Sequence, residues 1–392
     1  MWPNLCSWGL MLQAIRSLFE PLYLNVQFDL TNACNLRCTH CYHPNHLNNN
    51  ALTVEEWIKV TDEVKTFSFE ARAVPVFFIC GGEPTLAESF ARVLRKIRSD
   101  FPKAEIVVLT NGTTLTRPLP GGGTALSLIC EVGAQVQVSL DGATATYHDS
   151  IRGVGNFDKA VSGVMLLRQN GITVLLQSVL SRITAGQIPD FFRLASELNV
   201  QVMNFIRLVE EGMAVKYVAG FGNQSPHLTG EELRSAMNEI LKNSKHFKIS
   251  TSTDGPLWAL IDPKLGSAAR LGFYEMIVDY QGYLKVSSRT SIRLGHVLRD
   301  GIWNSLSKSK IVQDLRRGDI SGCKDCSLFH AKKCSGDRNI AFAATGTYLG
   351  PDVGCWKWIA ENEESKNYFR ASVSVGRGTR IHQNETRKIN AS

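Results

Sequence analysis

The chain of 392 residues is long enough for two or three domains, or for one large α/β domain with additions. Its hydrophobic fraction of 44% suits a globular core, and no apolar run approaches the ~20 residues that cross a bilayer, so we expect no membrane span. The formal net charge of +7 is modest and the basic residues are spread out, which argues against a nucleic-acid partner.

An N-terminal segment, residues 1–22, precedes the first predicted strand. It is apolar, but no basic residue precedes the apolar stretch and no small-residue cleavage site follows, so a signal peptide is not expected. Met11 offers an alternative start. The ten cysteines fall mostly in two tight clusters, which is typical of metal or redox sites in the cytosol rather than of a secreted disulfide framework. We therefore expect a cytoplasmic protein.

Strand and helix patterns alternate from residue 23 to residue 210. Apolar and polar residues alternate strictly in YLNVQFDLT, which predicts a half-buried strand. Five further strand patterns lie in VPVFFIC, EIVVLT, AQVQVS, ITVLLQSVLS and QVMNFIRLV. Predicted helices separate them: one that opens with a capping box of Thr53 and Glu56, one around residues 90–97, and others near 122–132, 157–170 and 188–198.

Six strands, most of them followed by a helix, predict an α/β fold with parallel strands. Six units are too few for an eight-stranded barrel, so an open or partial barrel fits better. Three strand ends carry glycine with polar residues, in CGGEP, TNG and SLDG. Ligand sites gather at the C-terminal ends of parallel strands, although glycines also simply make tight turns there.

The alternation stops after residue 210. A linker, GFGNQSPHLTG, leads to a helix capped by Thr229 with Glu232, and FYEMIVDYQGYLKVSS predicts a β-hairpin that turns at Gln281-Gly282. A short helix near 301–317 precedes the second cysteine cluster. The predicted domains are an N-terminal segment at 1–22, a barrel at 23–210, a linker with a helix at 211–272, a cysteine-rich domain at 273–362 and a basic, disordered tail at 363–392.

The first cluster, TNACNLRCTHCYHPN, holds three cysteines within eight residues: Cys34, Cys38 and Cys41. A structural zinc site needs four ligands, and His40 or His43 would be the fourth. An iron–sulfur cluster held by three cysteines leaves one iron open to a small molecule. The spacing alone allows both kinds of site.

The letters CNLRCTHC form a C-x3-C-x2-C motif in the loop after the first strand, which resembles the motif of the radical S-adenosylmethionine (radical SAM) enzymes. The GGEP turn, Gly81–Pro84, resembles the backbone site by which that family binds the methionine amino group. The resemblance covers about residues 23–210 and implies a partial (β/α)6 TIM-like barrel.

The resemblance implies that Cys34, Cys38 and Cys41 act in catalysis by ligating a [4Fe–4S] cluster, whose open iron binds S-adenosyl-L-methionine. Reductive cleavage of this cofactor would yield a 5′-deoxyadenosyl radical that abstracts a substrate hydrogen. The residues implied in cofactor binding are His40, Gly81, Gly82, Glu83, Pro84, Ser139 and Arg152. His40 stands where the family usually has an aromatic ring near the adenine. Ser139 and Arg152 match segments near the cofactor's carboxylate and ribose, and an arginine that braces a loop is the alternative.

The second cluster has the spacing C-x2-C-x7-C-x20-C and consists of Cys323, Cys326, Cys334 and Cys355. Four cysteines close a metal site, and zinc is the simplest occupant from these residues alone. Beside the first motif, the stretch resembles the C-terminal SPASM extension, which carries auxiliary [4Fe–4S] clusters.

Full SPASM extensions have further cysteines, at positions where this chain has Ser287, Ser288 and Arg338. The remaining ligands suffice for one auxiliary cluster, so two clusters are expected in total. The auxiliary cluster would either take an electron from the substrate radical or brace the substrate cavity.

Enzymes with this extension most often crosslink, oxidise or epimerise ribosomally made peptides or proteins, which is the function we expect. Oxidation or rearrangement of a small molecule, such as a tetrapyrrole or a sugar derivative, is the alternative, and a non-catalytic metal scaffold is a third. About twenty-two residues precede the first strand, too few for a leader-binding domain, so a separate protein or the barrel edge would bind a leader. A reduced flavodoxin or ferredoxin-type protein would donate the electron.

Overall fold

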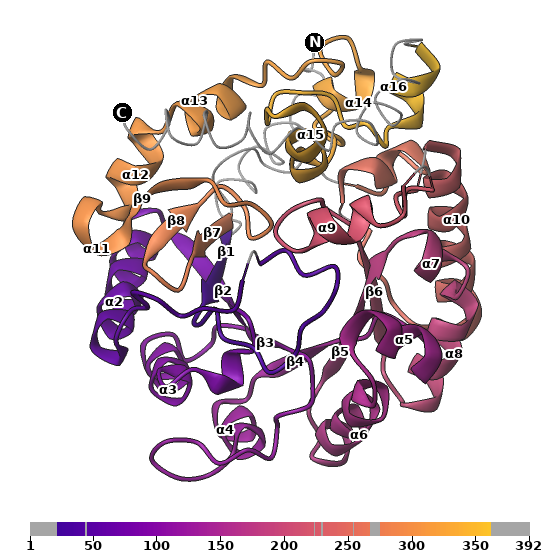
Figure 1. Cartoon of the computed structure of the whole chain (residues 1–392). Coiled ribbons are helices and arrows are strands. Elements are labelled where there is room, and N and C mark those ends of the chain that lie inside the picture. Colours follow the sequence, from indigo (N-terminus) through magenta and orange to yellow (C-terminus); the bar gives the residue numbers. More distant parts are fainter. Residues whose placement is uncertain are drawn as a thin grey trace, which may run out of the picture.

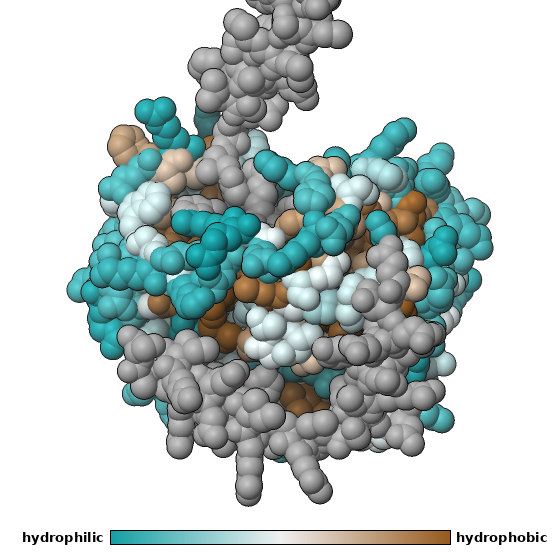
Figure 2. All heavy atoms as spheres, turned by 90° about the horizontal axis from the view of Figure 1, so that it is seen from above, coloured by the Kyte–Doolittle hydropathy of each residue, from teal (hydrophilic) through white to brown (hydrophobic). Residues whose placement is uncertain are grey.

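The computed structural model describes residues 22–43, 45–222, 224–228, 230–253, 255–266 and 275–361. The predicted N-terminal segment up to residue 21, the cap Thr229 and the predicted tail lie outside the described residues. Within the described ranges, no helix is both long enough and apolar enough to span a bilayer. Seen from above, the surface has hydrophilic residues at its left and right margins and apolar residues between them (Figure 2).

A nine-stranded sheet organises the fold (Figure 1), in the order β6-β5-β4-β3-β2-β1-β7-β8-β9. The first six strands are β1 (Leu22–Asp29), β2 (Ala73–Cys80), β3 (Ile106–Thr110), β4 (Gln135–Ser139), β5 (Val174–Leu180) and β6 (Val202–Arg207). Each of them pairs in parallel with the next. This confirms the six predicted strands and the predicted partial α/β barrel.

Helices surround the outer side of these strands (Figure 1). They are α2 (Val54–Glu70), α3 (Phe90–Asp100), α4 (Ala125–Val132), α6 (Asn156–Gln169) and α8 (Ile188–Glu197). Shorter elements lie at the strand ends: η1 (Pro84–Leu86), α5 (Ala145–Arg152), α7 (Arg182–Ala185) and α9 (Ala214–Ala219). Two more, α10 (Gly230–Phe247) and η2 (Pro256–Leu260), follow the barrel.

The alternation in β1 explains how the strand is buried. Its apolar residues face the helices: the Phe28 ring lies 5.2 Å from Trp57 of α2, and it also lies 5.9 Å from Phe77 of the neighbouring strand β2. The predicted capping box at the start of α2 is present, since Thr53 accepts from the Glu56 backbone and Glu56 accepts from the Thr53 backbone. Because successive side chains in a strand point to opposite faces, the polar residues of β1 face the inside of the barrel.

The C-terminal part continues the same sheet. Strand β7 (Glu275–Val278) pairs in parallel with β1, and β8 (Tyr283–Lys285) turns back against it, which confirms the predicted hairpin. Strand β9 (Arg293–His296) ends the sheet. The sheet therefore runs across the predicted boundary at residue 273, and the division into domains stays a prediction.

Short helices complete the C-terminal part: α11 (Val297–Asp300), α12 (Ile302–Lys308), α13 (Lys310–Arg317), α14 (Ser327–His330), α15 (Arg338–Thr345) and α16 (Trp356–Glu361). The single helix predicted near 301–317 is wrong in detail, because the structure has two helices there. Ser309 leaves the helical conformation between them, and its side chain accepts from the Val312 backbone to cap α13.

Candidate active site and C-terminal cysteine site

The three-cysteine loop lies between β1 and α2, and the glycine turn after β2 holds it in place. The backbone N–H of Gly82 donates to the Thr31 carbonyl at 2.8 Å, and that of Glu83 donates to the Ala33 carbonyl at 2.9 Å. A Cβ on Gly81 or Gly82 would lie 2.4 or 2.3 Å from these same carbonyl oxygens. Glycine is therefore required at both positions for the loop to approach the sheet this closely.

The three thiols are half-buried and close to few polar groups. Burial raises the pKa of Cys34, Cys38 and Cys41, in the last case to about 11. Donors oppose this in part: the Leu36 backbone lies 3.4 Å from the sulfur of Cys34, Nη1 of Arg152 lies 3.9 Å from the sulfur of Cys38, and the His43 backbone donates to Cys41. Thiolates in such a place need a bound cation, so three sulfurs beside a guanidinium fit an iron–sulfur cluster.

The side chain of Glu83 forms hydrogen bonds within the barrel. Its fully buried carboxylate accepts hydrogen bonds from the Thr85 and Thr110 hydroxyls at 2.8 Å each, and from the Asn111 backbone at 2.9 Å. These bonds connect the end of β2 to the end of β3. Any contact of this residue or of Pro84 with a cofactor stays a prediction.

His43, weighed as a zinc ligand, pairs instead with backbone. Its Nε2 lies 3.2 Å from the Gly81 carbonyl oxygen, and burial lowers the pKa of the ring to about 3, so the imidazole is neutral and donates this hydrogen bond. His43 therefore helps to hold the glycine turn against the cysteine loop.

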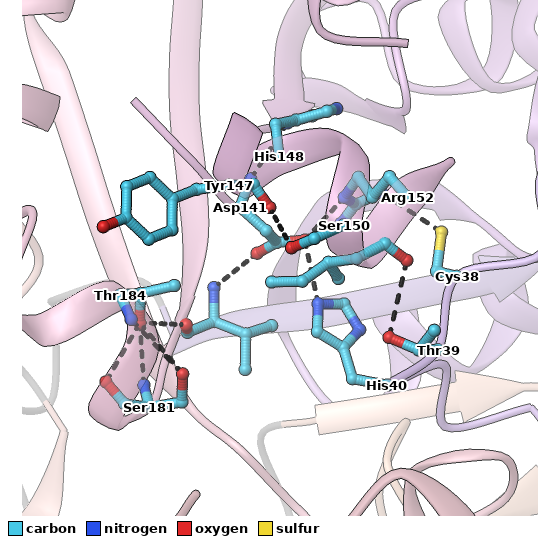
Figure 3. A network of polar contacts seen from close by, with 12 residues as sticks. Cys38, Thr39, His40, Asp141, Tyr147, His148, Ser150, Arg152, Ser181 and Thr184 are labelled. Carbon is cyan, nitrogen blue, oxygen red and sulfur yellow. Dashed lines mark hydrogen bonds and ion pairs between the residues drawn. The ribbon is translucent and has the colours of Figure 1, made fainter. Parts of the chain in front are cut away.

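A buried carboxylate, Asp141, joins three parts of the site (Figure 3). Its Oδ2 lies 2.9 Å from Nε2 of His40 and 2.5 Å from Nε of Arg152, and its Oδ1 accepts from the Val179 backbone at 2.8 Å. Burial alone would raise the pKa of Asp141, but the guanidinium of Arg152 and the hydrogen bonds from His40 and the Val179 backbone outweigh it and hold that pKa well below the usual range. Asp141 thus carries the negative charge that two predicted site residues share.

The sequence reasoning did not single out Asp141, although the letters SLDG contain it. The backbone after it packs closely against α5, since a Cβ on Gly142 would lie 2.2 Å from the His148 nitrogen. The Asp141 N–H donates to Nδ1 of His148 at 3.3 Å. Ser139 ends β4 two residues earlier, so the structure brings it to the same strand end as Arg152 of α5.

The ring of His40 has a second neighbour. Tyr217 of α9 meets it edge to face, with ring centroids 6.2 Å apart. The imidazole is therefore held between a carboxylate and an aromatic ring, in the loop position where an aromatic residue was expected near the adenine.

The four C-terminal cysteines lie around one space. Cys323, Cys326, Cys334 and Cys355 all line a cavity of about 940 Å³. Burial raises the pKa of the Cys334 thiol to about 12 and that of Cys355 to about 11. Among the described residues, no three His, Cys, Asp or Glu side chains are spaced to hold a single metal ion. Four thiols around one cavity match the four thiolate ligands of an iron–sulfur cluster.

A smaller cavity of about 250 Å³ lies where β5 and β6 meet the C-terminal part. Gln177, Asn204 and Arg207 line it from the barrel, and Arg289 and Asp337 line it from the C-terminal part. The cavity is therefore lined by amide groups from the middle of β5 and β6 and by charges of both signs.

Arg207 also connects this cavity to the four-cysteine cavity. Its Nη1 donates to Oδ2 of Asp352 at 2.8 Å, and Asp352 lines the larger cavity.

Comparisons with known proteins agree with this geometry. Residues 28–195 match the family described as the Radical SAM superfamily. The "Mycofactocin maturase MftC" of Mycobacterium tuberculosis is 29% identical over 385 residues, which cover 93% of this chain and 91% of that protein. The "AdoMet-dependent heme synthase" of Methanosarcina barkeri is 24% identical over 357 residues, which cover 84% of this chain and 95% of that protein. The solved structure of "Native anSMEcpe with bound AdoMet and Cp18Cys peptide" has the same fold, with a TM-score of 0.65 at 18% identity over 90% of this chain and 99% of that chain.

Proposed function

Because this chain belongs to the radical SAM superfamily, we propose that it is a maturase that modifies a ribosomally synthesised peptide or protein. Radical SAM enzymes use a [4Fe–4S] cluster and S-adenosyl-L-methionine. When bound, these groups supply a 5′-deoxyadenosyl radical that takes a hydrogen atom from the substrate. The residues of this chain have to hold the cofactors, exclude water and present one substrate hydrogen.

Each part of the first site has a task in this proposal. Cys34, Cys38 and Cys41 would ligate the cluster, and the guanidinium of Arg152 offsets negative charge at Cys38. Asp141 fixes the orientation of Arg152 and of His40, which lies on the side expected for the adenine.

The C-terminal cysteines would hold one auxiliary [4Fe–4S] cluster. The cavity that they share offers four protein ligands, which would leave no iron open to a substrate. This cluster would take an electron during a crosslink or dehydrogenation, or brace the substrate during an epimerisation.

The alignment with the mycofactocin maturase carries the peptide assignment, because it extends over 93% of this chain and so includes both cysteine sites. Two further observations support it. The anSMEcpe structure, which shares the fold, contains a peptide. The 250 Å³ cavity is lined by the amide of Gln177 and by Asn204, whose oxygen accepts from the Ser252 backbone and whose amide nitrogen can still donate to a peptide carbonyl.

The proposal includes three further components. A reduced flavodoxin or ferredoxin-type protein would supply the electron that starts each cycle. A separate protein, or the barrel edge, would bind a peptide leader. The cytosol would keep the seven cluster cysteines reduced before the clusters assemble.

Anaerobic reconstitution tests the cofactor assignment. About eight iron atoms per chain, with formation of 5′-deoxyadenosine, are expected for two four-iron clusters. About four irons with one zinc and retained cleavage would make the C-terminal cysteines a zinc site. Absence of both iron and cleavage would contradict the whole proposal.

The substrate is tested separately. Short peptides encoded beside the gene would be incubated with the reconstituted protein, cofactor and reductant, and analysed by mass spectrometry. A mass change that needs the intact cysteine loop is expected. Turnover of a tetrapyrrole or sugar derivative without change in any such peptide would favour the small-molecule alternative, which the similarity to the heme synthase keeps relevant.

A further inference from the structure

Arg338 lies directly behind the wall of the four-cysteine cavity, at the start of α15. It occupies the position where the SPASM resemblance would place another cysteine. Only 7% of the residue is exposed, and a buried guanidinium is rare unless it is paired. The contacts of Arg338 therefore indicate on which groups its positive charge acts.

Three backbone carbonyls hold the guanidinium in place. Nη1 donates to Tyr348 at 2.9 Å and to Gly350 at 2.7 Å, and Nε donates to Gly336 at 3.3 Å. Among the described residues, no partner accepts a hydrogen bond from Nη2. Carbonyls orient the group without neutralising it, so the positive charge remains available.

The unpaired nitrogen faces a residue of the cavity wall. Gly336 and Gly350 both line the four-cysteine cavity. A Cβ on Gly336 would lie 2.4 Å from Nη2, so only a glycine lets the guanidinium approach the wall this closely.

A second cation contacts the same cavity. Nζ of Lys357, in the first turn of α16, lies 3.8 Å from the sulfur of Cys326. Lys357 itself lines the cavity. One cation is therefore in contact with a thiol, and a second lies behind the cavity wall at Gly336.

Among the described residues, the acidic side chains that line the cavity form no ion pair with Arg338 or Lys357, although the charge of Asp352 acts on Arg338. Asp352 is paired with Arg207 at 2.8 Å, and Asp319 is paired with Lys324 at 2.7 Å. Asp325 is exposed, where solvent screens its charge.

From this arrangement we propose that Arg338 and Lys357 raise the reduction potential of the [4Fe–4S] cluster held by the four C-terminal cysteines. A cluster with four thiolates is anionic and gains a further negative charge on reduction, so nearby fixed cations stabilise its reduced form more than its oxidised form. The cluster is thereby suited to accept an electron rather than only to brace the fold. This inference rests on the auxiliary cluster of the proposed function.

The test is an anaerobic redox titration followed by EPR. It uses the full chain with Cys34, Cys38 and Cys41 replaced by Ala, so that the C-terminal cluster alone is observed. Arg338→Met and Lys357→Met are each expected to lower the midpoint potential, and Arg338→Lys is expected to restore part of the loss. Arg317→Met is the matched control, because its guanidinium on α13 is 67% exposed and paired with Asp314. It should leave the potential unchanged.

The outcomes separate this inference from the proposed function. An unchanged midpoint in Arg338→Met and Lys357→Met, with full iron content, overturns the inference and leaves the auxiliary cluster intact. A parent protein that binds zinc instead of iron at these cysteines overturns both. If Arg338→Met fails to assemble because three carbonyls lose their donor, Lys357→Met decides: a potential equal to that of the parent overturns the inference, and a lowered potential supports it.

Discussion

Nη1 of Arg152 lies 3.9 Å from the sulfur of Cys38, although the two residues are 114 positions apart in the chain. The same guanidinium is fixed by Asp141, which follows β4, so a contact between α5 and the cysteine loop depends on a carboxylate from the barrel. A cation at this sulfur stabilises the thiolate that a cluster requires. The geometry of the first site is therefore set by the strand ends rather than by the loop alone.

Replacement of Cys38 should abolish cofactor cleavage. In Cys38→Ala, two thiols remain, which is too few to hold the cluster with one iron open. We expect loss of 5′-deoxyadenosine formation and a fall from about eight to about four iron atoms per chain. Cys130→Ala is the control, since Cys130 lies exposed on α4 and should behave as the parent does. Normal cleavage by Cys38→Ala would contradict the assignment of the loop.

Replacement of Cys326 should separate the two clusters. Cys326→Ala leaves the cysteine loop untouched, so cofactor cleavage should continue, while formation of the modified substrate should stop. Both are measured in one reaction, by chromatography of 5′-deoxyadenosine and mass spectrometry of the peptide. Normal product formation by this variant would show that the auxiliary cluster has no part in the reaction.

Loss of the Asp141 charge should destabilise the folded state. In Asp141→Asn, the buried Arg152 loses its counter-charge, and breaking a buried ion pair costs about 3–5 kcal/mol. Anaerobic urea unfolding measures this difference. Asp190→Asn is the control, because its pair with Arg193 is exposed and contributes about 1 kcal/mol or less. Equal losses in the two variants would mean that Asp141 carries no buried charge.

Much of the barrel could be predicted from local patterns, because strand and helix periodicity record which face of each element is buried. Helix α5 was not predicted, because it buries only His148 and Ile151. Two buried residues are too few to show a helical period. Its position depends on a close backbone contact at Gly142 that no periodicity encodes.

The long-range pairings could not be predicted for the same reason. The hairpin of β7 and β8 was visible in the sequence, but nothing local indicates that β7 lies beside β1. The cysteines were recognised by spacing, whereas Asp141 and Arg338 act through partners that only the fold brings near them. Sequence therefore indicated the proposed ligands of both sites more readily than the charges around them.

His148 should make stability fall in mild acid. Burial lowers the pKa of its ring from 6.5 to about 4, and Nδ1 accepts from the Asp141 backbone. Below pH 6.5 the unfolded chain takes up a proton that the folded chain binds only near pH 4, so the free energy of unfolding decreases as the pH falls through this window. The loss is about 2 kcal/mol at about pH 5. Urea unfolding of His148→Phe should show a smaller decrease, and equal pH dependence in both proteins would contradict the assignment.

Addition of one methyl group at Gly82 should impair assembly of the first cluster. A Cβ there would lie 2.3 Å from the Ala33 carbonyl oxygen, and both groups are backbone, so the cysteine loop has to move away from the sheet. We expect Gly82→Ala to retain the C-terminal cluster and to lose most of the iron of the first, with a parallel loss of cofactor cleavage. Gly186→Ala is the matched control, because a Cβ at Gly186 has no atom within 4 Å and this glycine, like Gly82, has no positive φ. Equal iron content in the two variants would show that the close approach of the glycine turn does not hold the cysteines in place.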